Sequence, residues 1–123
     1  KAAEAAYLGP QQSVETMRLQ FAHRRDLIVG LANDIAGFKT TIPDGAFYIF
    51  PKVDSLFGKK SENGDEIKNA TDLVMYLLNV AHVACVSGDA FGDPSCIRFS
   101  YATSDEKIIE AFKRVKEAVL KLK

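Results

Sequence analysis

Arg98 is the residue whose type and position in this sequence most clearly suggest chemistry. It lies in the middle of a mostly apolar segment, residues 96–102, which reads CIRFSYA and predicts a strand. A charged group buried without a partner is costly, so a guanidinium in such a strand needs an anion within reach. The planar donor fork of arginine fits a carboxylate or a phosphate. Arg98 is therefore the candidate anion-binding residue.

Strand alternation determines what surrounds Arg98. One face of the strand carries Arg98 together with small side chains, which leave room for a ligand, and the other face carries large apolar ones. The small residues are Cys96, Ser100 and Ala102, and the candidate core residues are Ile97, Phe99 and Tyr101. Two alternatives to a bound ligand stay open: an internal ion pair with an Asp or Glu of this chain, or a guanidinium that extends to water at the sheet edge.

No other group of residues forms a recognisable catalytic, cofactor-binding or metal site. His23 and His82 are far apart, and Cys85 and Cys96 have no CxxC spacing, so no metal-ligand pattern is present. The loop at residues 87–94 contains two glycines and two aspartates but lacks the G-x-G-x-x-G order of a nucleotide-binding turn. We therefore expect no catalytic, cofactor-binding or metal-ligating residue in this chain.

Length and composition limit the class of protein. The 123 residues fit one domain, and a hydrophobic fraction of 47% excludes a disordered chain. Lys plus Arg and Asp plus Glu both total 16, so nucleic-acid binding is not expected. No apolar run approaches the ~18 residues that span a bilayer, and no signal peptide is visible, so no membrane association is expected. Isolated thiols in apolar stretches predict a cytoplasmic protein, and the initial Lys1 suggests a piece of a longer one.

A long amphipathic helix is expected over residues 10–36. Apolar residues recur at seven-residue spacing along it, as Val14, Phe21, Ile28 and Ile35. Arg24 falls on the same stripe. Either the helix leaves one contact surface there and enters another, as a helix bridging two domains would, or Arg24 lies at the margin of the stripe and extends to water.

The remaining elements predict a small sheet covered by helices. The turn at residues 43–45 precedes a buried strand at 46–50, and residues 55–69 form a polar, solvated loop. A helix capped by Thr71, a strand at 82–86, the Arg98 strand and a terminal helix after a capping box at residues 103–106 follow. The buried face of that last helix is expected to carry Ile108, Phe112, Val115, Val119 and Leu122. This order predicts a two-layer α+β sandwich whose small sheet is mostly antiparallel or mixed.

Three ordered motifs resemble a known family. Residues 43–51 (PDGAFYIFP), 83–92 (VACVSGDAFG) and 97–104 (IRFSYATS) are similar to the C-terminal part of fold-type I, class I and II aminotransferases. Within that family they most resemble the bacterial aspartate aminotransferases. The segment at residues 24–28 (RRDLI) is similar to the helix that links the large and small domains of these enzymes.

The resemblance implies an activity and a set of partners. Family members use pyridoxal 5'-phosphate to exchange an amino group between an amino acid, here aspartate by overall resemblance, and a 2-oxo acid. Arg98 matches the arginine that holds the substrate α-carboxylate, and Gly45 and Phe47 match a segment bordering the substrate pocket. The whole of residues 1–123 matches the small domain. A large domain of the same chain and a homodimeric parent enzyme are the further partners that the resemblance implies.

Departures from the family pattern define what this chain lacks. No lysine follows the Ser-x-Ser-Lys-like motif of the Schiff-base lysine, and Ser87 stands where the family usually has proline. The groups that bind the cofactor belong to the large domain, so we expect the isolated chain to be inactive. The alternative, which Arg98 suggests without the resemblance, is an autonomous regulatory module that binds a small carboxylate or an amino acid.

Overall fold

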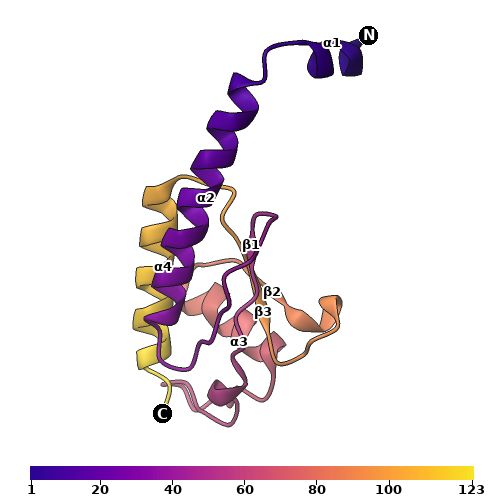
Figure 1. Cartoon of the computed structure of the whole chain (residues 1–123). Coiled ribbons are helices and arrows are strands. Elements are labelled where there is room, and N and C mark those ends of the chain that lie inside the picture. The colour runs from indigo at the N-terminus through magenta and orange to yellow at the C-terminus, as the bar shows by residue number, and fades with distance from the viewer.

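The computed structural model describes all 123 residues and shows a small antiparallel sheet covered by helices. The helices are α1 (Ala2–Leu8), α2 (Gln12–Asn33), α3 (Ala70–Tyr76), the π-helical turn η2 (Leu77–Ala81) and α4 (Asp105–Leu120). The strands are β1 (Tyr48–Ile49), β2 (Val86–Ser87) and β3 (Ile97–Ser100), with 3-10 turns η1 (Asp54–Leu56) and η3 (Gly88–Phe91). Helices α2 and α4 lie side by side along the sheet (Figure 1). The α+β prediction is confirmed.

The strand that carries Arg98 is the central strand of the sheet. The spatial order is β1-β3-β2, and both pairings are antiparallel. Tyr48 of β1 lies opposite Ser100, and Val86 of β2 lies opposite Arg98. This register places Arg98 between two neighbouring strands, away from the sheet edge.

The core forms as the alternation and the helical periodicity predict. Ile97, Phe99 and Tyr101 are buried, and so are the five apolar residues predicted for the last helix, four of them on α4 and Leu122 just beyond its end. Full burial of one large apolar side chain stabilises a fold by roughly 1.5–3 kcal/mol, so these residues anchor α4 to the sheet. No helix combines the length and the apolar composition needed to cross a membrane.

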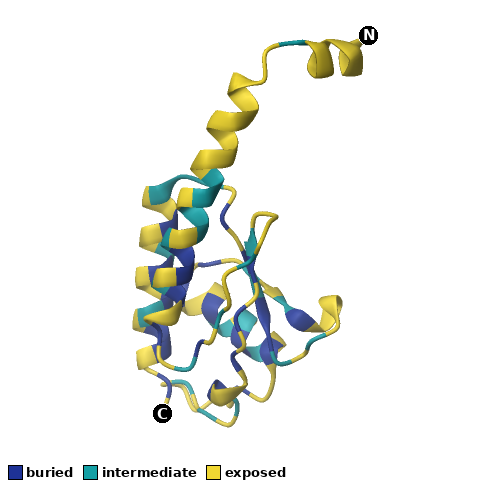
Figure 2. Cartoon of the chain, in the orientation of Figure 1, coloured by how far each residue is buried: buried dark blue, intermediate teal, exposed yellow.

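Helix α2 is shorter than expected, and its first half projects from the domain into solvent. It spans Gln12–Asn33 rather than residues 10–36, because the left-handed Gly37 (φ 95°) follows a turn at its end. Residues 12–20 are all exposed, and burial begins only at Phe21 (Figure 2). Arg24 forms an ion pair with Asp105 one turn after Gln20 and Phe21, the first residues of α2 that contact the body. The short helix α1, which the sequence pattern does not predict, lies beyond the exposed end (Figure 1).

The strand expected at residues 46–50 is wrong in extent and burial. Only Tyr48 and Ile49 pair, because Ala46 adopts a left-handed conformation (φ 64°) that ends the extended backbone. Phe47 and Phe50 are 41% and 37% exposed, so Ile49 is the single buried residue of the segment. The aromatic side chains of this segment are therefore partly available to a ligand or a partner.

Two other boundaries also differ from the prediction. The strand expected at 82–86 reduces to Val86–Ser87, because His82 takes a left-handed conformation (φ 54°) at the end of η2. The cap of α3 is Asn69 rather than Thr71, since Asn69 Oδ1 accepts a hydrogen bond of 2.9 Å from the Asp72 amide. An asparagine satisfies that free amide as well as a threonine does.

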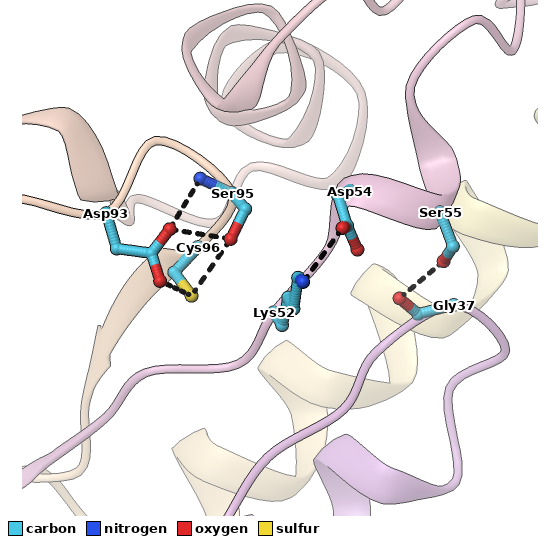
Figure 3. A network of polar contacts seen from close by, with 7 residues as sticks. All are labelled: Gly37, Lys52, Asp54, Ser55, Asp93, Ser95 and Cys96. Carbon is cyan, nitrogen blue, oxygen red and sulfur yellow. Dashed lines mark hydrogen bonds and ion pairs between the residues drawn. The ribbon is translucent and has the colours of Figure 1, made fainter.

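The loop at residues 55–69 is anchored rather than simply solvated. Leu56 and Ile67 are buried in the core. The backbones of Lys60 and Lys123 exchange two hydrogen bonds, of 2.8 and 3.0 Å. Ser55 Oγ donates to the Gly37 carbonyl, as Figure 3 shows. These contacts tie the loop to the C-terminus and to the turn that follows α2.

Candidate functional site

Arg98 is positioned by β3 on the face of the sheet opposite the core. The buried neighbours Ile97 and Phe99 fix the strand, and alternation turns the guanidinium the other way, where its residue is half-buried. No carboxylate of this chain lies within 4.0 Å of the Arg98 guanidinium, and the guanidinium donates no hydrogen bond within the chain. The internal ion pair that the sequence left open is therefore not formed.

Two aromatic rings take the place of an anionic partner. The Arg98 guanidinium carbon lies 4.5 Å from the centroid of the Tyr48 ring and 4.2 Å from that of the Phe91 ring. Both distances are within the range of a cation–π interaction. Tyr48 reaches Arg98 as a diagonal neighbour, because it lies opposite Ser100 in the antiparallel register. Phe91 comes from η3, the turn that follows β2.

The acidic residues nearest in sequence to Phe91 are engaged elsewhere. Asp89 accepts hydrogen bonds from Ser87 and Thr71. Asp93 accepts hydrogen bonds from Ser95 and from the Cys96 thiol, and the Ser95 bonds lower the pKa of the Asp93 carboxyl (Figure 3). The guanidinium is thus left without an anion although two aspartates lie in the adjacent loop.

The loop that presents Phe91 is tightly seated. Gly88 donates its amide to the Cys96 carbonyl at 2.8 Å, and the Asp93 amide donates to the Gly88 carbonyl at 3.1 Å. A Cβ at Gly88 would lie 2.1 Å from the Asp93 carbonyl oxygen, so only glycine fits. The Phe91 ring also meets Phe50 edge-on, with centroids 6.3 Å apart. Backbone and ring contacts therefore hold Phe91 over Arg98.

Gly45 and Phe47 lie at a different hollow, of about 400 Å³, beside α2. Arg18 and Arg25 of α2 line it together with Tyr101, and Arg98 does not. A Cβ at Gly45 would meet open space, so no group of this chain approaches that backbone closely. Phe47 connects this hollow to the surroundings of Arg98 only indirectly, because its ring centroid lies 4.4 Å from that of Tyr48.

A larger hollow, of about 680 Å³, does not include Arg98 either. It lies beside α4 and is bordered by residues 82–84 and the end of β3. Its size alone does not mark it as the functional site, because the group with a specific chemical requirement, the unpaired guanidinium, lies elsewhere.

The side chains of this chain do not fit the cofactor that the sequence resemblance implies. Pyridoxal phosphate bonds to a lysine whose amine can lose its proton, which requires a lowered pKa. Lys52 shows the reverse: the carboxylate of Asp54, 3.1 Å away, raises the pKa of its amine. The other lysines are exposed, except for Lys59 and Lys116, which are half-buried, and Lys116 forms an ion pair with Asp34. No group of three or more His, Cys, Asp or Glu side chains could hold a metal ion.

Tyr48 and Phe91 are the site residues that sequence reasoning missed. In the sequence, the aromatic run at 47–50 is typical of a core strand, and Phe91 belongs only to a loop. Their relation to Arg98 depends on the pairing of β1 with β3 and on the path of η3. The only signal in the sequence is that one aromatic residue lies in the segment of β1 and another in the loop that follows β2.

Comparison with known proteins gives consistent matches over nearly the whole chain. The family model of aminotransferase class I and II matches residues 1–115. The aspartate aminotransferase of Rhizobium meliloti (strain 1021) is 43% identical over 117 residues, which are 95% of this chain and 28% of that protein. A bifunctional aspartate aminotransferase and glutamate/aspartate-prephenate aminotransferase of Petunia hybrida is 43% identical over 110 residues, 89% of this chain and 23% of that protein.

Solved structures show the same relation. The aspartate aminotransferase from Rhizobium meliloti superposes with a TM-score of 0.96 and 41% identity, over 99% of this chain and 30% of that one. The alanine aminotransferase from Pyrococcus furiosus superposes with a TM-score of 0.82 and 32% identity, over 97% of this chain and 28% of that one. This chain thus spans less than a third of the relatives that it matches.

Proposed function

We propose that this chain, which belongs to the aminotransferase class I and II family, is the substrate-binding small domain of a longer aminotransferase. Members of this family use pyridoxal phosphate. The whole protein would transfer an amino group between an amino acid and a 2-oxo acid. Membership in the family favours this function over the alternative of an autonomous carboxylate-binding regulatory module.

The unpaired guanidinium of Arg98 is the observation that carries the proposal. Every amino acid and every 2-oxo acid has an α-carboxylate, and a guanidinium binds a carboxylate through two parallel hydrogen bonds. Arg98 is half-buried, and its guanidinium makes no internal ion pair or hydrogen bond. Its donors are therefore free for a substrate carboxylate, which would complete the charge pair when it binds.

Pyridoxal phosphate would be held by the remainder of the longer protein, because the lysines of this chain do not fit it. When bound, the cofactor supplies the electron sink for the transfer of the amino group. The part assigned to this chain is to hold the carboxylate of the substrate in a fixed place. Correct placement of a reacting molecule is itself a large contribution to catalysis.

Exposed apolar side chains support docking of a large domain along α1 and the first half of α2. Tyr7 and Leu8 are more than four-fifths exposed, and Val14, Met17 and Leu19 are each more than half exposed. Apolar surface gathered on one protruding segment is typical of a surface that another domain covers. We therefore infer that α2 links this domain to the large one.

Aspartate is the proposed amino-acid substrate, because the Rhizobium and Petunia relatives are named as aspartate aminotransferases. The homodimeric state and the cytoplasmic location stay predictions from the sequence.

Replacement of Arg98 in the whole enzyme tests the proposed function. Arg98→Leu should lower kcat/KM for the amino acid by roughly a hundredfold or more, since a bidentate charged contact is lost. Arg98→Lys keeps the positive charge but lacks the planar fork, so its kcat/KM should lie between those of the wild type and of Arg98→Leu. Arg114→Leu is the matched control, because Arg114 pairs with Glu110 on the outer face of α4. Values near the wild type for Arg98→Leu would overturn the proposal.

A further inference from the structure

We propose that Phe91 and Tyr48 are positioning residues that hold the Arg98 guanidinium ready for a carboxylate. This inference rests on the proposed function, in which Arg98 binds the α-carboxylate of the substrate. It gives a role to two aromatic side chains that act through Arg98 rather than on the substrate or the cofactor. We call the two rings together the aromatic clamp.

The aromatic clamp holds Arg98 from two elements on opposite sides of β3. Tyr48 belongs to β1, and Phe91 belongs to η3, which directly follows β2. The guanidinium carbon lies over both rings, at 4.5 Å and 4.2 Å from their centroids. A long side chain that would otherwise sample many rotamers is thereby restricted before any ligand arrives.

Aromatic rings suit this task better than an acidic residue would. The face of a ring carries partial negative charge, which stabilises the cation without accepting its N–H donors. An Asp or Glu at the same place would occupy those donors and compete with the substrate. The rings therefore stabilise the charge of Arg98 in the free protein, before a carboxylate binds.

The surroundings of Phe91 fix its ring in that position. The loop bearing it closes through hydrogen bonds of Gly88 with Cys96 and Asp93, and Gly92 adopts a left-handed conformation (φ 84°) directly after it. Phe50 contacts the ring edge-on. Phe91 is 47% exposed, so its place in the loop owes little to burial and much to these contacts.

Nuclear magnetic resonance tests the aromatic clamp independently of activity. In this 123-residue chain labelled with ¹⁵N, the Arg98 Nε–Hε resonance, identified by its loss in Arg98→Lys, should be shifted by the ring currents. Phe91→Leu and Tyr48→Leu should each move it toward the position of a free arginine. Val86→Ala is the matched control, because Val86 lies opposite Arg98 in the sheet but has no ring. A resonance unmoved in both Leu variants overturns the proposal.

Kinetics of the whole enzyme test the consequence for binding. Phe91→Leu and Tyr48→Leu should each lower kcat/KM roughly 3- to 30-fold, the range of one cation–π contact, mainly through a higher KM. The amino acid and the 2-oxo acid should be affected alike, since both carry the α-carboxylate. Phe91→Tyr and Tyr48→Phe keep a ring and should restore kcat/KM to within about twofold of the wild type.

The Arg98→Leu variant separates the two proposals. If it abolishes binding of the carboxylate while both ring-deletion variants behave like the wild type, the proposed function stands and the aromatic clamp is wrong. If Arg98→Leu leaves kcat/KM unchanged, the proposed function fails, and the resonance of Arg98 still decides whether the rings hold the guanidinium.

Discussion

Arg24 donates its Nε to Asp105 Oδ1 at 2.9 Å, and this ion pair fastens α2 to the first residue of α4. Gln20 and His23 of α2 lie 3.3 and 3.1 Å from the same carboxylate. A carboxylate in the first turn also interacts favourably with the helix dipole. Three side chains of the long helix thus converge on Asp105 where α2 leaves the body of the domain.

The stability of the domain should depend on Asp105 in acid. The hydrogen bond from Arg24 is the largest of the causes that hold the pKa of the Asp105 carboxyl below its ordinary value of 3.8. A carboxyl with a lowered folded-state pKa stabilises the fold above its unfolded pKa and loses that contribution as the pH falls through the folded value. Urea unfolding of Asp105→Asn should show reduced stability at pH 7 and a difference from wild type that disappears in acid.

Glu117→Gln is the control for that experiment, because Glu117 is exposed on α4 and forms no ion pair. It should follow the wild-type pH profile. If the Asp105→Asn deficit persisted unchanged well below pH 3.8, the ion pair would not be its cause.

A methyl group at Gly88 should disrupt the loop that carries Phe91. The added Cβ would lie 2.1 Å from the Asp93 carbonyl oxygen and 2.5 Å from that of Cys96, and backbone atoms cannot yield as a flexible side chain can. Gly88→Ala should therefore reduce the free energy of unfolding by about 2–3 kcal/mol. Denaturant unfolding followed by circular dichroism measures the change.

Gly30→Ala is the control for this experiment, because the same substitution is expected to increase stability there. Gly30 lies in the interior of α2, and nothing would approach its Cβ within 4 Å. The substitution should raise the free energy of unfolding by roughly 0.5–1 kcal/mol, since alanine favours a helix. A Gly88→Ala variant as stable as wild type would contradict the close backbone packing of the loop.

The isolated chain should self-associate through the exposed half of α2. Val14 and Met17 are 54% and 55% exposed on a segment that no other part of this chain covers. Light scattering at high concentration should show dimers or larger species, and the double variant Val14→Glu, Met17→Glu should reduce them. Met75→Glu, at an exposed position on α3, should not. A strictly monomeric wild-type chain at high concentration would contradict this prediction.

The sequence predicts the order of the elements after α1 and the buried faces of β3 and α4, because both follow from local periodicity. The alternation around Arg98 places Ile97 and Phe99 in the core, and the spacing from Ile108 to Leu122 identifies the inner face of α4. The strand ends could not be predicted. They depend on the left-handed conformations of Ala46 and His82, which residues other than glycine adopt only uncommonly.

The candidate site was predictable in its charged residue and not in its surroundings. An arginine in an apolar strand is a local signal, so Arg98 stands out without any knowledge of the fold. The rings of Tyr48 and Phe91 reach it across 50 and 7 residues of sequence, respectively, through strand pairing and the path of a turn. Gly45 and Phe47 were placed by resemblance, and the structure puts them at a neighbouring hollow beside α2.

The most direct test of the central claim compares two substrates in two enzymes. The claim is that Arg98 binds the α-carboxylate, so the measurement is the ratio of kcat/KM for an amino acid to that for its α-carboxamide, in the wild-type enzyme and in Arg98→Leu. The wild type should prefer the carboxylate by roughly a hundredfold or more, and the variant should lose most of that preference. An equal preference in both enzymes would contradict the claim, because the carboxylate would then be recognised by another group.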